Sequence, residues 1–393
     1  MTTADVVIVG GGVVGCSIAW HLRRDGFAGR VVVIERDSTY ARASSNLAMG
    51  GIRQQFSVAP NIAMARYSVR FYERFDETMS VGGFTSDAWL RQRGYLFLVD
   101  HASAATFGAR IERQRSLGAT VEKWSVDRIR RHVPVLMLDD IAFGAFGPED
   151  GYADPKRVLA GFRAGAAHAG AEFIEGEVTA IEHTAGRVTG VVVGGSSIAT
   201  PVVVNAAGAY AARVGQMAGV SLPVIPVRQQ LFRCALPARL PFRLPMIIDP
   251  SGVHWRHDDA RSPDSPDRIV VAHSNADEAP GENLTADTSR WDSEYAPPLV
   301  RRVPGWRGLQ PIEGWAGLYE MTPDHNAIIG EHPAVHGFYL ANGFSGHGLM
   351  MAPATGRAVS DLIRTGRSEA VDVTPFRIAR FAHGALMHDD AML

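Results

Sequence analysis

The sequence predicts an α/β fold in which a Rossmann-like domain is interleaved with a second domain built on an antiparallel sheet. The chain opens with an apolar strand that runs into a glycine-rich turn and a helix, over residues 6–22. A second apolar strand, residues 31–34, ends on the acidic residue Glu35. Later segments alternate between apolar strands and a region rich in Pro and Arg at 220–315. This alternation indicates two kinds of domain.

The glycine-rich turn follows the pattern G-x-G-x-x-G, with Gly10, Gly12 and Gly15 as its fixed positions. The first glycine permits a tight turn, the second lets backbone approach a pyrophosphate, and the third lets helix and strand pack closely. The free N–H groups at the start of the helix attract phosphate. Glu35 follows at the distance expected of a carboxylate that binds ribose. Together these features predict a dinucleotide site.

Hydrophobic spacing predicts the remaining elements. Asn61–Met79 is expected to be a helix with Ala63, Tyr67, Phe71 and Phe75 on one face, and Pro60 at its start. Asp154-Pro155 begins another helix, whose buried stripe is Val158, Leu159, Phe162 and Ala166. Strands are expected at 172–175, 178–182, 188–193, 201–205, 227–234, 246–248, 253–256, 269–273 and 337–341, with a turn at 185–186, a polar loop at 258–267 and a helix over 353–363.

Composition limits the function classes. The chain has 393 residues, 46% of them hydrophobic, and a net charge of -2, so nothing favours nucleic acid as a partner. Its two cysteines, Cys16 and Cys234, do not make a disulfide framework, and no metal site is expected. No signal peptide is visible, and no apolar run approaches the ~18 residues that would span a bilayer. The expected location is cytoplasmic.

Two further loops separate the possible dinucleotides. An NAD dehydrogenase continues with more βαβ units, whereas here the second strand leads into a loop of small residues at 43–56. A second glycine-rich helix start follows at 343–350. With these motifs, and with Glu149–Tyr152, Val203–Ala209 and Thr322–Asp324, the chain resembles the D-amino-acid oxidase superfamily of FAD-dependent amine oxidoreductases. It looks most similar to the branch of sarcosine oxidase β-subunit, proline dehydrogenase β-subunit and glycine oxidase.

The resemblance implies a fold similar to p-hydroxybenzoate hydroxylase, with FAD bound in an extended form. The FAD-binding domain is expected at 1–80, 148–218 and 318–375, the substrate domain at 81–147 and 219–317, and a tail at 376–393. Glu35 and Arg36 are assigned to the adenosine end, and the region around Gly346 to the pyrimidine end of the flavin. The expected FAD contacts are Gly10, Gly12, Val13, Val14, Gly15, Glu35, Arg36, Ser44, Ser45, Asn46, Ala48, Met49, Gly50, Gly51, Val178, Ala206, Ala207, Gly208, Gly343, Gly346, His347, Gly348, Leu349 and Met350.

Departures from relatives refine these expectations. Where some relatives attach FAD through a cysteine this chain has Gly317, and its 44–47 loop lacks the histidine that others use, so FAD is expected to be non-covalent. Relatives that react with oxygen carry a lysine facing the flavin; the matching strand here, 268–273, contains none, and Val270 is expected at that position. Met350 stands where some relatives have a lysine.

A substrate carboxylate requires a cation, preferably an arginine. Glycine oxidase-like relatives have one where this chain has Tyr319, which leaves Arg53 and Arg256 as candidates. His254, His273 and His347 are the candidate histidines of the pocket, with a purely structural role as the alternative.

The expected reaction is oxidation of the C–N bond of a secondary or N-substituted amino acid, sarcosine-like or proline-like. Hydride passes to flavin N5, and the imine product hydrolyses. A peroxide-forming D-amino-acid or glycine oxidase is one alternative. A flavin-bound subunit of a complex without turnover of its own is the other. The expected partners are an amine or amino-acid substrate and an electron acceptor (oxygen, a quinone or a partner subunit), and a homo- or hetero-oligomer is possible.

Overall fold

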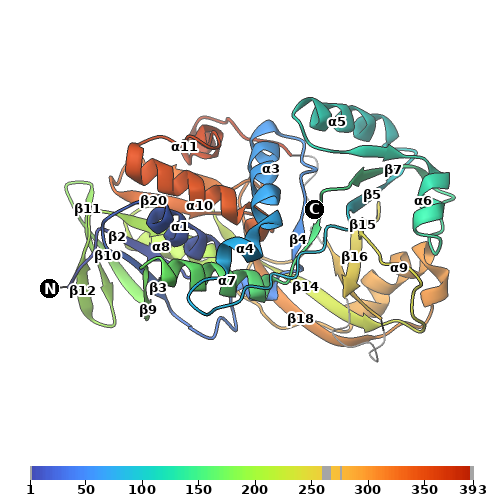
Figure 1. Ribbon diagram of the computed structural model, residues 1–393, viewed down its shortest axis with the longest axis horizontal. Coiled ribbons are helices and arrows are strands. Elements are labelled where there is room, and N and C mark those ends of the chain that lie inside the picture. The colour runs from blue at the N-terminus through green and yellow to red at the C-terminus, as the bar shows by residue number, and fades with distance from the viewer. Residues whose placement is uncertain (1, 259–266, 275–276, 390–393) are drawn as a thin grey trace.

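The computed structural model describes residues 2–258, 267–274 and 277–389. It is a mixed α/β structure in which two large sheets lie side by side along the long axis (Figure 1). The six-stranded sheet lies toward the left of that view and the eight-stranded sheet toward the right, with helix α3 between them. Most of the expected 258–267 loop falls outside the described residues.

The six-stranded sheet has the order β19-β20-β13-β2-β3-β9 and is parallel except for β19. Its central strand is apolar throughout because both faces are covered. Val6 and Ile8 face the core shared with the helices, whereas Val7 and Val9 pack toward a four-stranded sheet. The strands are β2 (Val6–Val9), β3 (Val31–Glu35), β9 (Glu172–Glu175), β13 (Val203–Asn205), β19 (Ile328–Glu331) and β20 (Phe338–Asn342).

The four-stranded sheet covers the second face and has the order β1-β12-β11-β10. The turn between β10 and β11 lies at Ala185 and Gly186, both of which have positive φ. This confirms the expected turn. The strands are β1 (Thr2–Thr3), β10 (Val178–Thr184), β11 (Arg187–Val193) and β12 (Ser196–Ala199).

Helices cover the first face of the six-stranded sheet. Helices α1 (Val13–Arg24) and α10 (Gly348–Thr365) pack tightly because Gly356 has no side chain; a Cβ there would lie 2.2 Å from Ser17 Oγ. Asp154 caps α7 (Pro155–His168) by accepting from the N–H groups of Lys156 and Arg157. The other helices are α2 (Ser44–Leu47), α3 (Ala59–Glu73), α4 (Phe75–Met79), α5 (Ala104–Ser116), α6 (Val126–His132), α8 (Ala211–Met217), α9 (Ala296–Arg302) and α11 (Ala379–Ala382).

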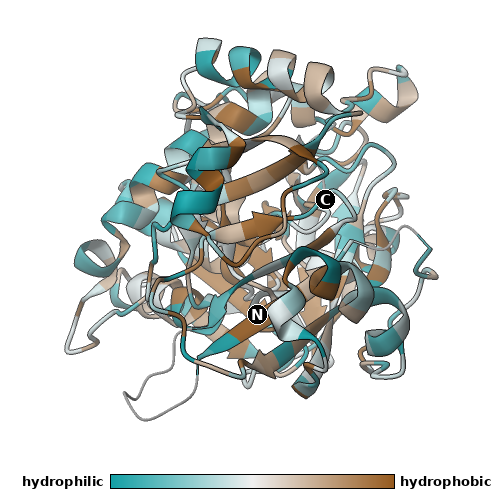
Figure 2. Cartoon of the chain, turned by 90° about the vertical axis from the view of Figure 1, so that its right-hand side faces the viewer, coloured by the Kyte–Doolittle hydropathy of each residue, from teal (hydrophilic) through white to brown (hydrophobic). Residues whose placement is uncertain are grey.

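The eight-stranded sheet is antiparallel except where β15 pairs with β5, and it has the order β18-β14-β17-β16-β15-β5-β7-β6. Its strands and α9 enclose a second apolar core. Figure 2 views this end and shows apolar strands inside with hydrophilic segments toward the outline. The strands are β5 (Tyr95–Asp100), β6 (Glu122–Trp124), β7 (Ile141–Gly147), β14 (Ile225–Ala235), β15 (Met246–Ile248), β16 (Val253–Asp258), β17 (Arg268–His273) and β18 (Pro311–Met321). A short antiparallel pair joins β4 (Gly51–Ile52) to β8 (Gly151–Tyr152).

The helix expected over 61–79 is the clearest difference from the prediction. The structure divides it at Arg74 into α3 and α4. Of the predicted apolar face, Phe75 is buried and Tyr67 and Phe71 are half-buried against the core, but Ala63 is exposed. Ile62, Ala65 and Val69 form a second buried face, and Phe71 stacks on Phe162 of α7. The buried stripe expected on α7 is confirmed.

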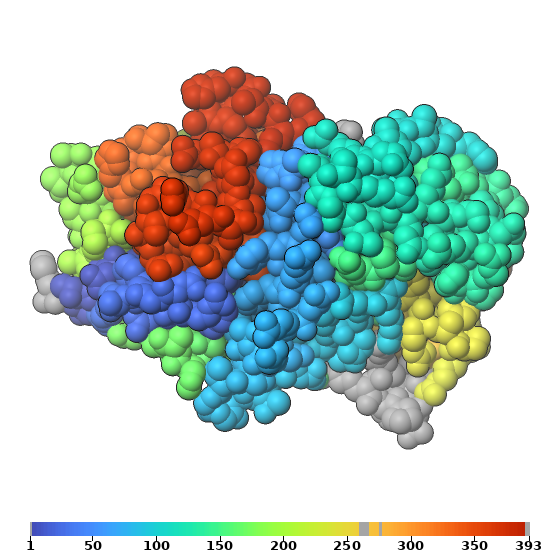
Figure 3. Space-filling view, turned by 45° about the horizontal axis from the view of Figure 1, so that its top comes forward, coloured from blue at the N-terminus to red at the C-terminus, as the bar shows by residue number. Residues whose placement is uncertain are grey.

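The C-terminal segment is tied to the rest of the molecule. Arg380 forms a buried ion pair with Asp324 at 2.7 Å. Asp389 accepts hydrogen bonds from the Ser57 and Asn61 side chains just before and within the first turn of α3. In Figure 3 the red C-terminal helices lie against the light-blue segment that contains α3. In the described part of the chain, no helix has the length and apolar character needed to cross a membrane.

Candidate active site

One elongated cavity touches both large sheets. Its walls come from the glycine-rich turn, the loop after β3, the segment after β13, the start of α10, and strands β14, β16, β17 and β18 of the eight-stranded sheet. Loops at the carboxyl ends of parallel strands are the usual ligand site of such a sheet. The glycine-rich turn and β14 therefore mark two ends of one site.

The glycines of the turn are required by close backbone contact. Gly10 has φ +103°, and a Cβ there would lie 2.4 Å from the Ala206 carbonyl oxygen. A Cβ at Gly15 would lie 1.9 Å from the Gly10 carbonyl oxygen, so Gly15 packs α1 against the turn and does not line the cavity. Gly12 lines the cavity, and the nearest atom to its Cβ position is Ser45 Oγ at 3.4 Å. Gly12 therefore presents backbone to a ligand.

Glu35 lies at the end of β3, as expected, and lines the cavity. Its Oε2 accepts the Gly11 N–H at 2.8 Å, and its Oε1 accepts the Asp37 N–H at 3.1 Å. These bonds fix the carboxylate beside the glycine-rich turn. Its orientation suits the ribose role expected from the sequence.

The loop at 44–46 supports the start of α1. Ser45 Oγ accepts the Val13 N–H at 3.1 Å, and Ser44 Oγ donates to the Leu318 carbonyl at 2.7 Å. Both serines line the cavity. Asn46 does not line it; its Nδ2 donates to the Tyr40 carbonyl at 3.1 Å.

The Arg36 guanidinium stacks on the Tyr210 ring, with Cζ 3.7 Å from the ring centroid. The Tyr210 hydroxyl is buried and has no hydrogen-bond partner among the described residues. Val178 and Ala207 complete this part of the cavity wall. The planar Arg36 guanidinium and Tyr210 ring, with the unpaired Tyr210 hydroxyl, suit an aromatic base with polar edges.

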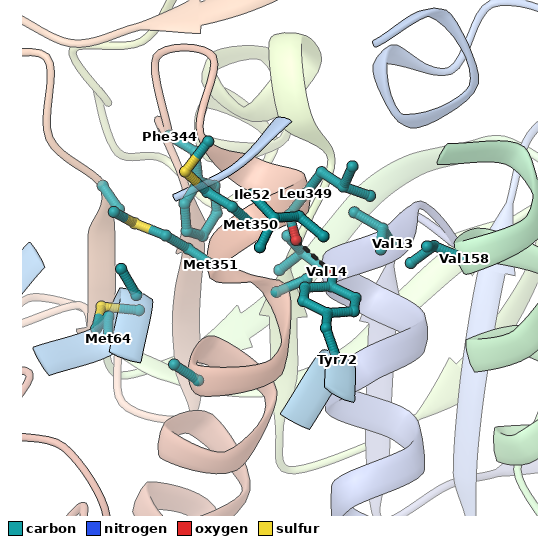
Figure 4. Packing of buried hydrophobic residues seen from close by; sticks show 14 of the residues in the cluster. Val13, Val14, Ile52, Met64, Tyr72, Val158, Phe344, Leu349, Met350 and Met351 are labelled. Atoms are coloured by element: carbon teal, nitrogen blue, oxygen red, sulfur yellow. Dashed lines mark hydrogen bonds between the residues drawn. The ribbon is translucent and has the colours of Figure 1, made fainter. Parts of the chain in front are cut away.

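The opposite end of the cavity is formed by the start of α10 and by β18. A Cβ at Gly346 would lie 2.5 Å from the Tyr319 ring, so this glycine makes room for the ring. The Tyr72 hydroxyl donates to the Leu349 carbonyl at 2.6 Å, which fixes the first turn of α10. Figure 4 shows this bond and the packing of Leu349, Met350 and Ile52 around it. The N–H groups of the first turn are thus held at the cavity.

Arg53 is the buried cation of this end. It is 1% exposed, and it stacks on the Phe56 ring at 4.2 Å. Its Nη1 donates to the Gln55 carbonyl and its Nη2 to His347 Nε2, the latter at 3.2 Å. Because the guanidinium can only donate, Nε2 of His347 accepts and Nδ1 carries the proton toward the Phe344 carbonyl at 3.3 Å. Burial and the Arg53 charge lower the pKa of His347 to about 3, so His347 is neutral.

A buried carboxylate supports the Arg53 loop from behind. Asp150 accepts the Gln54 N–H at 2.9 Å and the Gln55 Nε2 at 3.3 Å. Burial raises the pKa of Asp150 to about 7, while Gln54, Gln55 and Arg53 oppose the rise. Asp150 does not line the cavity, so it positions the loop that carries Arg53.

The three other polar candidates differ in position. His254 lines the cavity and points Nδ1 at the Gly252 carbonyl at 3.0 Å; burial lowers its pKa to about 4. Arg256 does not line the cavity. Its Nε donates to the Met49 carbonyl at 2.8 Å and its Nη1 to the His257 carbonyl at 2.9 Å. Arg256 therefore supports the 48–51 loop from outside the cavity. His273 does not line the cavity either; its Nε2 contacts the Ser251 carbonyl oxygen at 3.2 Å.

The cavity brings together most residues that the sequence nominated. Of that set, the residues that do not line it are Gly15, Asn46, Arg256, Val270, His273 and Gly343. Gly343 is excluded because it turns toward Thr322, whose Cγ2 would lie 2.5 Å from a Cβ there. Val270 lies in a small apolar cluster beside the wall, while its neighbour Ala272 lines the cavity.

Other lining residues were not nominated from the sequence: Tyr40, Arg42, Tyr95, Tyr210, Arg213, Gln229, Leu231, Ala272 and Glu320. Most lie on β5, β14 and β17 or in loops without a motif. Glu320 had one signal, its place directly after Tyr319 in a recognised motif. Because neighbours on a strand point to opposite faces, a pocket position for Tyr319 predicts that Glu320 points away from the pocket.

The residues present suit a bound flavin dinucleotide. The turn at Gly10 and Gly12 and the start of α1 suit a diphosphate, Glu35 suits a ribose, and the unpartnered Tyr210 hydroxyl lies on the same wall. The start of α10 offers a second set of backbone N–H groups at the opposite end. Lys123 and Lys156, the chain's only lysines, are outside the cavity.

Comparison with known proteins gives one family. The model of the family DAO, FAD dependent oxidoreductase, matches residues 5–362. The chain is 33% identical to FAD-dependent oxidoreductase domain-containing protein 1 of Bos taurus, over 99% of this chain and 87% of that protein. It is 26% identical to mitochondrial sarcosine dehydrogenase of Homo sapiens, over 98% of this chain but only 42% of that protein.

Solved structures give the same picture. L-proline dehydrogenase from P. horikoshii superimposes with a TM-score of 0.88 at 30% identity, covering 98% of this chain and all of the other. Glycine oxidase from Geobacillus kaustophilus gives a TM-score of 0.83 at 25% identity, covering 97% and 99%.

Proposed function

Because the chain belongs to the DAO family of FAD-dependent oxidoreductases, we propose that it oxidises the C–N bond of a small secondary or N-substituted amino acid. The observation that carries this proposal is Arg53, a buried guanidinium in the wall of the cavity that also contains the glycine-rich turn. A buried cation at the substrate end favours an anionic ligand, and planar carboxylates suit guanidinium geometry. Sarcosine-like and proline-like compounds combine a carboxylate with a secondary amine.

The surrounding side chains suit a neutral amine. Leu231, Ala272 and Met49 are apolar, and an apolar wall disfavours an ammonium ion. His254 is neutral, with its Nδ1 proton directed to Gly252, so its Nε2 lone pair can accept a hydrogen bond from an amine N–H. Its low pKa makes it a weak base, so His254 orients the amine and does not remove its proton.

The residues then fix the reacting bond. Arg53 holds the carboxylate, and the apolar wall limits the access of water. FAD, when bound, supplies the acceptor for the hydride that leaves the carbon next to nitrogen. The remaining iminium is hydrolysed by water to an amine and a keto acid or aldehyde.

We further propose that the enzyme is a dehydrogenase and that FAD is held non-covalently. No lysine lies in the wall of the cavity, and Gly317 has no side chain for a covalent link. The FAD-binding domain is proposed at 1–80, 148–218 and 318–375. The six-stranded sheet falls within these segments, while β18 crosses the boundary at 317/318. A cytoplasmic location stays a prediction.

The test is anaerobic mixing of the purified protein with sarcosine, L-proline and glycine, followed through flavin absorbance. Bleaching by sarcosine or L-proline, but not by dimethylamine, which lacks the carboxylate, is expected. Equal bleaching by dimethylamine contradicts the Arg53 argument. If no amino acid bleaches the flavin, the proposal that the isolated chain turns over its substrate is wrong, and a role as a subunit is favoured. Admitting air then separates the two classes, since rapid reoxidation with peroxide contradicts a dehydrogenase.

A further inference from the structure

The proposed reaction makes no use of Glu320, a carboxylate in the wall of the cavity. It is the last residue but one of β18, directly after Tyr319. Its Oε2 accepts the Gly343 N–H at 2.9 Å, and the Phe344 N–H also points to the carboxylate. The side chain is half-buried and lines the cavity.

The carboxyl group lies between two backbone segments of the cavity wall. A Cβ at Gly208 would be 3.8 Å from Oε2, and a Cβ at Gly348 would be 3.7 Å from Oε1. Both glycines line the cavity. A ligand that follows these two glycines therefore passes the Glu320 carboxyl group.

The Glu320 carboxylate has no compensating cation in the part of the chain that the structure describes. Within residues 2–258, 267–274 and 277–389, no Arg, Lys or His forms an ion pair with Glu320. Tyr210, Tyr319 and His347 line the same cavity, and Glu320 pairs across the sheet with Pro226, two residues before Arg228 on β14. Arg228 pairs with Glu278, and His347 is neutral and occupied with Arg53. Burial raises the pKa of Glu320 to about 7, and only the two backbone N–H groups oppose this rise.

We propose that Glu320 directly contacts bound FAD and takes up a proton when FAD binds. FAD carries two negative phosphate charges, and its reduced ring can carry another, so an ionised Glu320 beside it is unfavourable. The protonated carboxyl group keeps its bond from Gly343 and gains an O–H donor for the nucleotide. The proposal for Glu320 rests on FAD as the cofactor and not on the identity of the amine. It can therefore hold even if the protein turns over none of the amines tested.

The test is the dissociation constant of FAD, measured on diluted holoenzyme from the fluorescence of released FAD across a pH series centred on about 7. If binding takes up one proton, the constant rises toward tenfold per pH unit above that pKa. Glu320→Gln mimics the protonated acid, so its constant should stay flat across the series. Glu313→Gln, an exposed position on the same strand, should follow the wild type.

Two results overturn the proposal. One is a wild-type constant that does not change, or that falls, with rising pH, which would mean that FAD prefers the ionised carboxylate. The other is a Glu320→Gln variant with the wild-type pH dependence. If that variant does not fold, proton release is measured on the wild type in weakly buffered solution about one pH unit above the pKa. Release of protons with FAD, approaching one per FAD, is expected, and no release overturns the proposal.

Discussion

Arg53 is the residue on which substrate binding is expected to depend most directly. Replacing it with Lys keeps the charge but loses the planar pair of donors and the stacking on Phe56. A charge-assisted bond of this kind contributes about 1.5–3 kcal/mol, so KM for the amino acid should rise roughly 10- to 100-fold. Steady-state kinetics with an electron-accepting dye provides the measurement. Arg131→Lys, at an exposed position on α6, is the control and should leave KM unchanged. An Arg53→Lys variant with wild-type KM would remove Arg53 from the substrate site.

Gly317 determines the expected mode of FAD attachment. A Cβ at this position would lie 3.1 Å from Leu47 Cβ, so there is little room for a reactive side chain, and the residue lines the cavity. Heat or acid precipitation should therefore leave the yellow FAD in the supernatant, measured by absorbance after centrifugation. Flavin that stays with the pellet and survives denaturing electrophoresis would show a covalent bond to another residue of the wall.

At the scale of elements, the contact between α1 and α10 positions both helix starts that face the cavity. Gly356→Ala places a methyl group within 2.2 Å of Ser17 Oγ and 2.6 Å of His21 Nδ1, and such overpacking costs about 1–3 kcal/mol. Gly108 on α5 has no neighbour within 4 Å of a Cβ, so Gly108→Ala should stabilise by about 0.5–1 kcal/mol. Urea denaturation of both variants tests the pair. If Gly356→Ala leaves the free energy of unfolding unchanged, α1 and α10 can move apart without loss of stability.

The same elements show what the sequence could predict. Strands β2 and β3 and the turn between β2 and α1 were predictable because each glycine has a separate backbone reason. The division into α3 and α4 at Arg74 was not, because no Gly or Pro marks the break in the sequence. Leu231 and Ala272 were also beyond prediction, since they meet the predicted His254 only through register across β14, β17 and β16. Arg256 was the second candidate after Arg53 in the sequence, and only the fold turns it toward the Met49 carbonyl.

At the scale of the whole molecule, buried histidines and carboxylates oppose each other in the pH dependence of stability. Burial lowers the pKa of His21 and His347 to about 3 and that of His254 to about 4, from 6.5. Below pH 6.5 the unfolded chain binds protons that these folded histidines do not, so acid destabilises the fold. Burial raises the pKa values of Asp150 and Glu320 to about 7. The folded protein therefore loses stability as the pH rises from the ordinary carboxyl pKa values toward 7.

Burial also lowers the pKa of His332, so the histidines outnumber the two carboxylates, and the free energy of unfolding should rise with pH up to about 6.5 and level off near 7. Each group contributes roughly 1.4 kcal/mol per pH unit inside its window. His21 lies far along α1 from the end that faces the cavity, so it can be replaced without changing the site. In His21→Phe, the slope of the free energy of unfolding against pH should fall by about one proton between about pH 4 and 6. His383→Phe, at an exposed position, should leave the slope unchanged. Urea denaturation at a series of pH values gives the slopes, and an unchanged slope in His21→Phe would mean that His21 is protonated in the folded protein.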